Sequence, residues 1–372
     1  MKEKILLGLT GAALCLAACS GSGSKTAGDT TTKDTAIMAM ADSSKSLKPK
    51  SPKPAWGADL KPEMQAVLEK LDSYGDKPIP QLTAPEARKN HTPTDAVMDL
   101  MKENNILMPA LAVDTTGKDI PGGLHVRIYT PKSGNGPFPV IVYYHGGGFV
   151  IANLDVYDAT PKTLSDMVGA VVVSVAYRLA PEHKFPAAHE DAYTAYKWVV
   201  DNAASIKGDP QKIALAGESA GGNLAVNTAI KARDKGVMLP TAILTVYPVA
   251  QSDMNTDSYI KNAGDKPLNK PMMAWFVKNY LNNMAEAKDP RINLVAANLK
   301  GLPTTTIITD QYDPLHDDGT MLADKMKAAG VNVDTKNYDG VTHEFFGMGA
   351  VVPQAKEAET YAAGQLKKAF GK

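Results

Sequence analysis

The chain has 372 residues and almost no cysteine. Its only two cysteines are Cys15 and Cys19, close to the N-terminus. The body of the protein therefore cannot contain a disulfide framework or a zinc site built from paired cysteines. For an exported protein, this lack of further cysteine avoids unwanted pairing in an oxidising compartment.

The sequence also lacks net charge. It contains 40 Lys and Arg and 40 Asp and Glu, with no dense basic tract, so it gives no indication of a nucleic-acid partner. Beyond the N-terminus, no apolar run approaches the roughly 20 residues of a membrane-spanning helix. The metal- and nucleotide-binding patterns HExxH, CxxC and GxxxxGK[ST] are missing too. With 44% hydrophobic residues, the chain is nevertheless long enough to bury a large core.

The N-terminus is typical of an export signal. Lys2 and Lys4 precede an apolar stretch over 5–18 that is rich in small residues. The stretch ends in Leu16-Ala17-Ala18-Cys19, which resembles the bacterial lipobox. This resemblance implies a signal peptide over 1–18 and a diacylglycerol anchor on Cys19. It also implies an outer-membrane location in a Gram-negative organism, because Ser20 is not the Asp that favours inner-membrane retention. An ordinary cleaved signal with a chance Cys is the alternative.

Two further segments precede the main pattern. Residues 19–57 are mainly Ser, Thr, Lys, Gly and Pro with few large apolar residues, which predicts a disordered tether. Residues 58–106 carry short stripes of helical periodicity and a capped helix start at Thr83. We expect this second segment to form a helical cap together with an insertion at 251–285, although an N-terminal structural bundle fits the periodicity nearly as well. The residues of the two stripes are Met64, Val67, Leu68 and Leu71, then Val97, Leu100 and Met101.

The remainder alternates between strand and helix patterns. Valines dominate the stretch 170–176, as in a parallel strand that is buried on both faces. The alternation predicts an α/β fold with a mostly parallel central sheet covered by helices on both faces. The expected strands are 124–129, 140–144, 170–176, 212–216, 242–247, 304–309 and 331–338, and the expected helices are 192–200, 220–235, 271–281, 318–329 and 361–370.

Ser219 is the candidate nucleophile. It lies in Gly217-Glu218-Ser219-Ala220-Gly221, between an expected strand and an expected helix. A nucleophile on such a sharp turn needs small neighbours, and the next helix directs its positive end at the reacting centre. On its own, the motif also fits a passive Ser in a Gly-rich turn.

Two other segments supply the partners that a serine nucleophile needs. The glycines of His145-Gly146-Gly147-Gly148 follow a buried strand, and their backbone N–H groups can stabilise an oxyanion. Asp313 follows another strand and precedes His343 by thirty residues, which supplies an acid and a base. Asp317 competes for the acid role. The chain order Ser, Asp, His is that of α/β-hydrolases.

These motifs resemble those of the hormone-sensitive lipase family of α/β-hydrolases, in its bacterial esterase branch. The similarity extends to Tyr177-Arg-Leu-Ala-Pro-Glu182 and to Asp313-Pro-Leu315, and it covers roughly residues 60–350. It implies the α/β-hydrolase fold and hydrolysis of short- to medium-chain carboxylic esters, without cofactor or metal. It further implies that the small-molecule ester reacts at Ser219, Asp313 and His343, and that the N–H groups of Gly147, Gly148 and Ala220 form the oxyanion hole. His145 is then a residue that holds the loop.

The chain departs from the family pattern at a few positions. Asp310 and Gln311 replace the usual Ala and Glu, Glu218 replaces Asp or Thr, and Glu344 stands where Gly commonly follows the catalytic His. Glu344 matters most, because a charge beside the base can raise the pKa of that base or alter the part of the site that holds the leaving group.

Some alternatives stay open. A ligand-binding protein without catalysis, or an amidase or peptidase, can be built on the same fold. Trp275, Phe276 and Tyr280 either line the acyl pocket or form the buried face of their helix.

Overall fold

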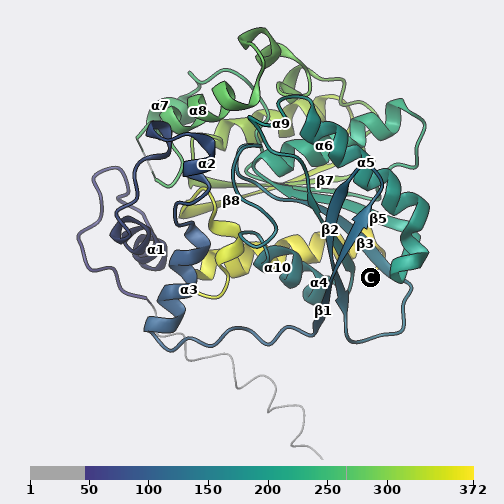
Figure 1. The fold of residues 1–372 in the computed structure, drawn as a ribbon, viewed down its shortest axis with the longest axis horizontal. Coiled ribbons are helices and arrows are strands. Elements are labelled where there is room, and N and C mark those ends of the chain that lie inside the picture. Colours follow the sequence, from purple (N-terminus) through teal and green to yellow (C-terminus); the bar gives the residue numbers. More distant parts are fainter. Residues whose placement is uncertain (1–46, 265) are drawn as a thin grey trace, which may run out of the picture. The chain divides into compact units, whose positions relative to one another are not determined.

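The computed structural model describes residues 47–264 and 266–372, which belong to one compact unit (Figure 1). The predicted signal peptide and Cys19 lie outside the described residues, as do residues 19–46 of the predicted tether. The prediction of disorder is wrong for residues 47–57, which pack on helix α1 (Pro62–Ser73). Leu47 is buried there, and the amide of Gln65 donates to the carbonyls of Ser51 and Pro52.

Eight strands form one sheet in the order β1-β2-β4-β3-β5-β6-β7-β8. β1 pairs antiparallel with β2, and β2 with β4, whereas the other neighbours are parallel. The prediction of a mostly parallel sheet is thus confirmed. The strands are β1 (Val113–Ile120), β2 (Leu124–Pro131), β3 (Phe138–Tyr144), β4 (Val171–Ala176), β5 (Gly208–Glu218), β6 (Ile243–Val246), β7 (Thr305–Tyr312) and β8 (Val333–Thr342).

The central strands are buried on both faces. In β3, Val140 and Val142 belong to one hydrophobic cluster, whereas Ile141 and Tyr143 belong to the cluster on the opposite face. Successive side chains of a strand point to opposite faces, so a continuous apolar run supplies both cores at once.

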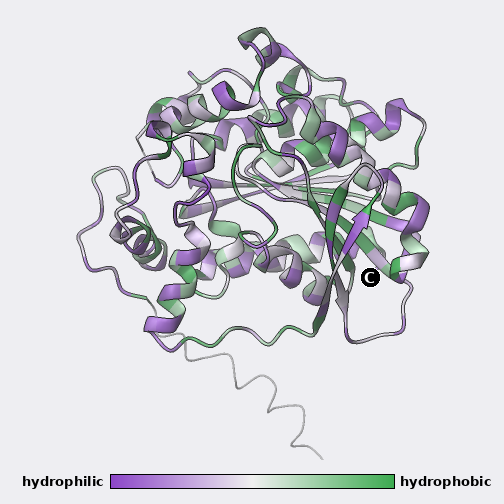
Figure 2. Cartoon of the chain, viewed as in Figure 1, coloured by the Kyte–Doolittle hydropathy of each residue, from purple (hydrophilic) through white to green (hydrophobic). Residues whose placement is uncertain are grey.

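Helices cover the two faces of the sheet. In Figure 1, α5 (Ala187–Asn202), α6 (Ala220–Asp234) and α9 (His316–Ala328) lie on one side, and α4 (Ala159–Val168) and α10 (Pro353–Ala369) on the other. The helices carry both hydrophobic and hydrophilic bands in Figure 2, as amphipathic helices do. No helix in the described ranges is long and apolar enough to cross a bilayer.

Two segments far apart in the sequence meet above the sheet. One contains α1, α2 (Ala84–Ala87) and α3 (Pro93–Glu103), and the other contains α7 (Asp257–Lys261) and α8 (Lys270–Tyr280). The indole N–H of Trp275 on α8 donates to the carbonyl of Leu82 at 2.9 Å. The capping box expected at Thr83 is present, with Glu86 accepting from the Thr83 backbone.

Candidate active site

The turn at Ser219 joins β5 to α6. Its φ of 55° and ψ of −117° lie in a region that L-residues rarely adopt, at a cost on the order of 1–3 kcal/mol. Small neighbours are required for steric reasons. A Cβ on Gly217 would collide with the carbonyl of Gly221, and a Cβ on Gly221 would collide with the carbonyl of Tyr144. The strained turn therefore depends on the glycines beside it.

The structure brings Ser219, His343 and Asp313 into one hydrogen-bonded chain. Nε2 of His343 lies 3.0 Å from Oγ of Ser219, and Nδ1 of His343 lies 2.7 Å from Oδ2 of Asp313. All three side chains are buried. A base that is oriented by a carboxylate can take the proton of a serine hydroxyl, which makes the hydroxyl a nucleophile.

Asp313 is held by hydrogen bonds from Leu315 and Asn262. Its Oδ1 accepts from the N–H of Leu315 at 2.8 Å, and Asn262 donates to its carbonyl at 2.9 Å. The competing acid, Asp317, instead accepts from the backbone N–H of Ser258. The geometry therefore favours Asp313 over Asp317 as the partner of His343.

The charge around His343 favours its protonated form. Burial on its own would lower the pKa of His343, but the charge of Asp313 and the hydrogen bond to it outweigh burial and raise the pKa. The nearby carboxyls of Glu344 and Glu218 act in the same direction. An imidazolium that forms during proton transfer is thus stabilised here.

The glycine loop after β3 presents free backbone donors. Among the described residues, no group accepts a hydrogen bond from the N–H of Gly147, Gly148 or Ala220. The loop is held by His145, whose Nδ1 lies 2.8 Å from the carbonyl of Gly146 and whose ring stacks on Tyr177. Burial lowers the pKa of His145 to about 4, so this imidazole is neutral and has a structural role.

A cavity of about 330 Å³ opens onto Ser219 and His343. Gly147 and Gly148 form its floor with Ser219 and His343, and Phe276 belongs to its apolar wall. The sequence left open which of the three aromatic residues on α8 line the acyl pocket. Phe276 lines this cavity, whereas Trp275 and Tyr280 do not. Tyr280 is buried against His189, with its hydroxyl 2.8 Å from Nδ1.

Two glutamates lie near the turn at Ser219, the buried Glu218 and the partly buried Glu344, and each is held by tyrosine. Tyr143 and Tyr247 donate to the two oxygens of Glu218, both at 2.5 Å. Burial raises the pKa of Glu218 to about 7, against the effect of these two hydrogen bonds. Tyr157 donates to Oε1 of Glu344 at 2.6 Å. No sequence motif reveals these tyrosines, because each lies between 29 and 187 positions from the glutamate that it holds.

Glu344 has an unusual backbone. Its φ of 72° and ψ of 3° place it in the left-handed region, between His343 and a short 3₁₀ helix over Phe345–Met348. Glycine adopts this conformation without strain, whereas other residues pay a cost on the order of 1–3 kcal/mol. The position thus explains why glycine is the common residue in the family pattern.

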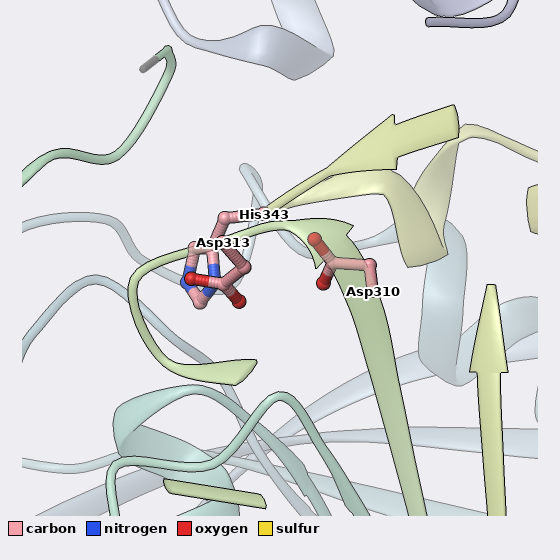
Figure 3. Close-up of side chains that lie close together, drawn as sticks. All are labelled: Asp310, Asp313 and His343. Atoms are coloured by element: carbon pink, nitrogen blue, oxygen red, sulfur yellow. The ribbon is translucent and has the colours of Figure 1, made fainter. Parts of the chain in front are cut away.

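Asp310 lies at the end of β7, beside Asp313 and His343 (Figure 3). One ligand atom from each of the three residues lies within 4.8 Å of the others, which is the one such group of potential metal ligands in the described part of the chain. However, the 2.7 Å hydrogen bond between His343 and Asp313 leaves no room for an ion between these two atoms. The residues present therefore do not fit a metal while the hydrogen-bonded chain is intact.

The comparisons with known proteins agree with this geometry. Residues 141–347 match a family described as the alpha/beta hydrolase fold. The carboxylesterase NlhH of Mycobacterium tuberculosis is 38% identical over 71% of this chain and 85% of its own length. The ethyl acetate hydrolase of Pseudomonas putida is 30% identical over 80% of this chain and 95% of its own length.

Solved structures of esterases are also similar to this chain. A hyperthermophilic esterase from the archaeon Pyrobaculum calidifontis is 37% identical, with a TM-score of 0.75 over 83% of this chain and 98% of that one. A thermostable esterase from Pseudomonas putida ECU1011 is 30% identical, with a TM-score of 0.77 over 86% of this chain and 99% of that one. The chain belongs to the α/β-hydrolase fold family and is a carboxylic-ester hydrolase.

Proposed function

We propose that this chain hydrolyses short- to medium-chain carboxylic esters through a covalent acyl intermediate on Ser219. The observation that carries the proposal is the hydrogen-bonded chain from Asp313 through His343 to Ser219, at 2.7 and 3.0 Å. His343 and Ser219 line a largely apolar cavity.

Each residue then has a defined role. His343 takes the proton from Oγ of Ser219 as Oγ attacks the ester carbonyl carbon, and Asp313 holds the imidazole in the tautomer that can accept it. The carbonyl oxygen becomes negative and accepts from the N–H groups of Gly147, Gly148 and Ala220. His343 gives its proton to the leaving alkoxide, and a water molecule activated by the same imidazole then releases the acid from Ser219.

The size of the cavity supports small acyl groups. Its volume of about 330 Å³ is at the lower end of typical ligand pockets, which hold roughly 300–1,000 Å³. The similarity to a protein named ethyl acetate hydrolase points to the same size class.

The test is a series of p-nitrophenyl esters from acetyl to dodecanoyl, with the full-length chain in detergent and Ser219→Ala as the control. We expect activity to peak at a short or medium acyl chain, and we expect Ser219→Ala to lower kcat by roughly 10⁴–10⁶-fold. A folded chain that turns over none of these esters would contradict the proposal.

We also propose that the protein is exported and anchored in the cell envelope through Cys19, at the outer membrane in a Gram-negative organism. The basic start, the apolar stretch over 5–18 and the lipobox-like Leu16-Ala17-Ala18-Cys19 support this location. A lipoprotein carries more than one acyl chain, and a single chain binds a membrane only marginally. Metabolic labelling with an alkyne fatty acid tests the anchor. The label should be present on the wild-type chain and missing from Cys19→Ala.

A further inference from the structure

The side chain of Glu344 forms a polar patch in the substrate cavity. Among the described residues that line the cavity, Glu344 supplies the only carboxylate. It also lines a separate cavity of about 60 Å³ whose walls are rich in methionine. The carboxylate therefore stands between two largely apolar spaces, beside His343.

The carboxylate is held from one side only. Tyr157 donates to Oε1 at 2.6 Å, and no other group in the described residues donates to either carboxylate oxygen. Tyr157 is itself buried against the glycine loop, since a Cβ on Gly146 would overlap its hydroxyl. One oxygen is thus fixed by a rigid donor, and Oε2 has no donor from the protein.

Apart from His343, which contacts Asp313 and Ser219, two side chains of the cavity wall can carry positive charge, and both already have partners. The guanidinium of Arg88 donates to both carboxylate oxygens of Glu182, at 2.9 and 2.7 Å, and to the carbonyl of Ala180. His91 lies 3.0 Å from Asp76. Neither group is available to neutralise Glu344, so a donor for Oε2 has to come from water or from the substrate.

The reaction chemistry fixes which part of the substrate passes Glu344. The protonated His343 gives its proton to the leaving oxygen, so the alcohol part of the ester lies on the His343 side. Glu344 follows His343 directly and lines the same cavity. Its backbone adopts a conformation suited to glycine, so the position holds a carboxylate although a smaller residue would fit without strain.

We propose that Glu344 makes the alcohol side of the cavity selective for esters whose alcohol carries a second hydrogen-bond donor, either a hydroxyl or an ammonium group. This inference rests on the proposed esterase function. A donor near the leaving oxygen pairs with Oε2, whereas an alkyl group leaves this acceptor desolvated and unpaired.

Four butyrate esters with alcohols of similar length test the inference, using the full-length chain and pH-stat titration. They are propyl, 2-methoxyethyl, 2-hydroxyethyl and 2-(dimethylamino)ethyl butyrate, the last assayed as its ammonium form. We expect the wild-type kcat/KM to be roughly 10-fold or more higher for the hydroxyl and ammonium esters than for the propyl ester. The methoxy ester should be no better than propyl, because its ether oxygen only accepts.

Two variants separate the contributions of charge and hydrogen bonding. Glu344→Gly should bring the hydroxyl-to-propyl and ammonium-to-propyl ratios close to one. Glu344→Gln should lose the ammonium preference, because Tyr157 occupies its single oxygen and the amide NH2 that then faces the substrate only donates. In this variant the hydroxyl and methoxy esters should be favoured over propyl to a similar extent, because both of their oxygens accept from that NH2. Glycine suits the backbone at this position, so a melting temperature of Glu344→Gly at or above that of the wild type shows that the comparison is between folded proteins.

The outcomes distinguish the role of Glu344 in selectivity from the esterase function of the chain. Equal ratios in wild type and Glu344→Gly, with active protein, would overturn the role of Glu344 and leave the esterase function standing. Turnover of none of the four esters by folded wild type would contradict the esterase function itself.

Discussion

The carboxyl of Asp310 lies beside that of Asp313, and both of its oxygen atoms are buried without a hydrogen-bond partner among the described residues. Two adjacent carboxylates cannot both be charged at low cost in a buried site. Burial and the charge of Asp313 raise the pKa of Asp310 well above its usual range, which favours the protonated form of this carboxyl.

From this protonation state we predict that Asp310→Asn leaves the pH dependence of kcat/KM unchanged. The amide is neutral and similar in size, so His343 experiences the same charge as before. A profile of kcat/KM against pH on a p-nitrophenyl ester measures this. A shift of the acidic limb to lower pH in Asp310→Asn would show that Asp310 is charged in the wild type.

Replacement of Asp313 should damage catalysis far more than replacement of Asp310. Asp313→Asn keeps the shape but changes the hydrogen bond that sets the tautomer of His343, so we expect kcat to fall by roughly 10⁴-fold. Steady-state kinetics of the two Asn variants side by side provide the test. Similar losses in both would contradict the assignment of Asp313 as the orienting acid.

The activity should rise with pH over a window above the ordinary His value of about 6.5. The base must be neutral to accept the proton of Ser219, and the pKa of His343 is raised, so activity falls as the pH drops through this raised value. Glu344→Gln should move the acidic limb to lower pH, because the carboxyl of Glu344 contributes to the raised pKa. A limb that stays in place in this variant would contradict the coupling.

The close approach of Gly221 to the carbonyl of Tyr144 predicts a steric failure in Gly221→Ala. The added Cβ meets backbone and cannot be accommodated by a side-chain rotation, so we expect strong destabilisation and loss of activity. The matched control is Gly364→Ala, at an exposed position of α10 with nothing within 4 Å of the added Cβ. It should stabilise the protein by about 0.5–1 kcal/mol. Thermal melting of both variants tests the predicted loss and gain of stability.

The buried Glu359 on α10 predicts a loss of stability at alkaline pH. Burial raises its pKa from 4.5 to about 8, so its folded form binds a proton more tightly than its unfolded form. The associated stability is present below about pH 4.5 and is lost as the pH rises through 8. Glu359→Gln should therefore raise the melting temperature at pH 9 relative to wild type and change it little at pH 5. Equal differences at both pH values would contradict this account.

The sequence predicted the parts of the fold whose residues carry a strong local pattern. The Val-rich β4 and the strand-turn-helix at Ser219 lie where their patterns indicated. β1 was not predicted, because Val113–Ile120 is polar and mostly exposed and is held by pairing with β2 rather than by burial. α4 was missed, and α5 and α10 begin earlier than their periodicity indicated.

In the site, too, the features that lie in local motifs could be predicted, and those that depend on distant contacts could not. The proposed nucleophile, acid and base stand in short motifs, so their meeting could be predicted from chain order. The environment of the site could not, because it depends on distant contacts. Tyr157 reaches Glu344 across 187 positions, and Tyr143 reaches Glu218 across 75. The protonation of buried acids follows from such packing, which no motif records.

The hydrogen bond from Trp275 to Leu82 has a consequence for how specificity can diversify. It joins two stretches that are 193 positions apart, and residues from both of them line the substrate cavity. An insertion or deletion in only one stretch would displace one side of the contact between them. New substrate preferences in this protein should therefore arise through paired changes in the two stretches, so that their natural variation is correlated.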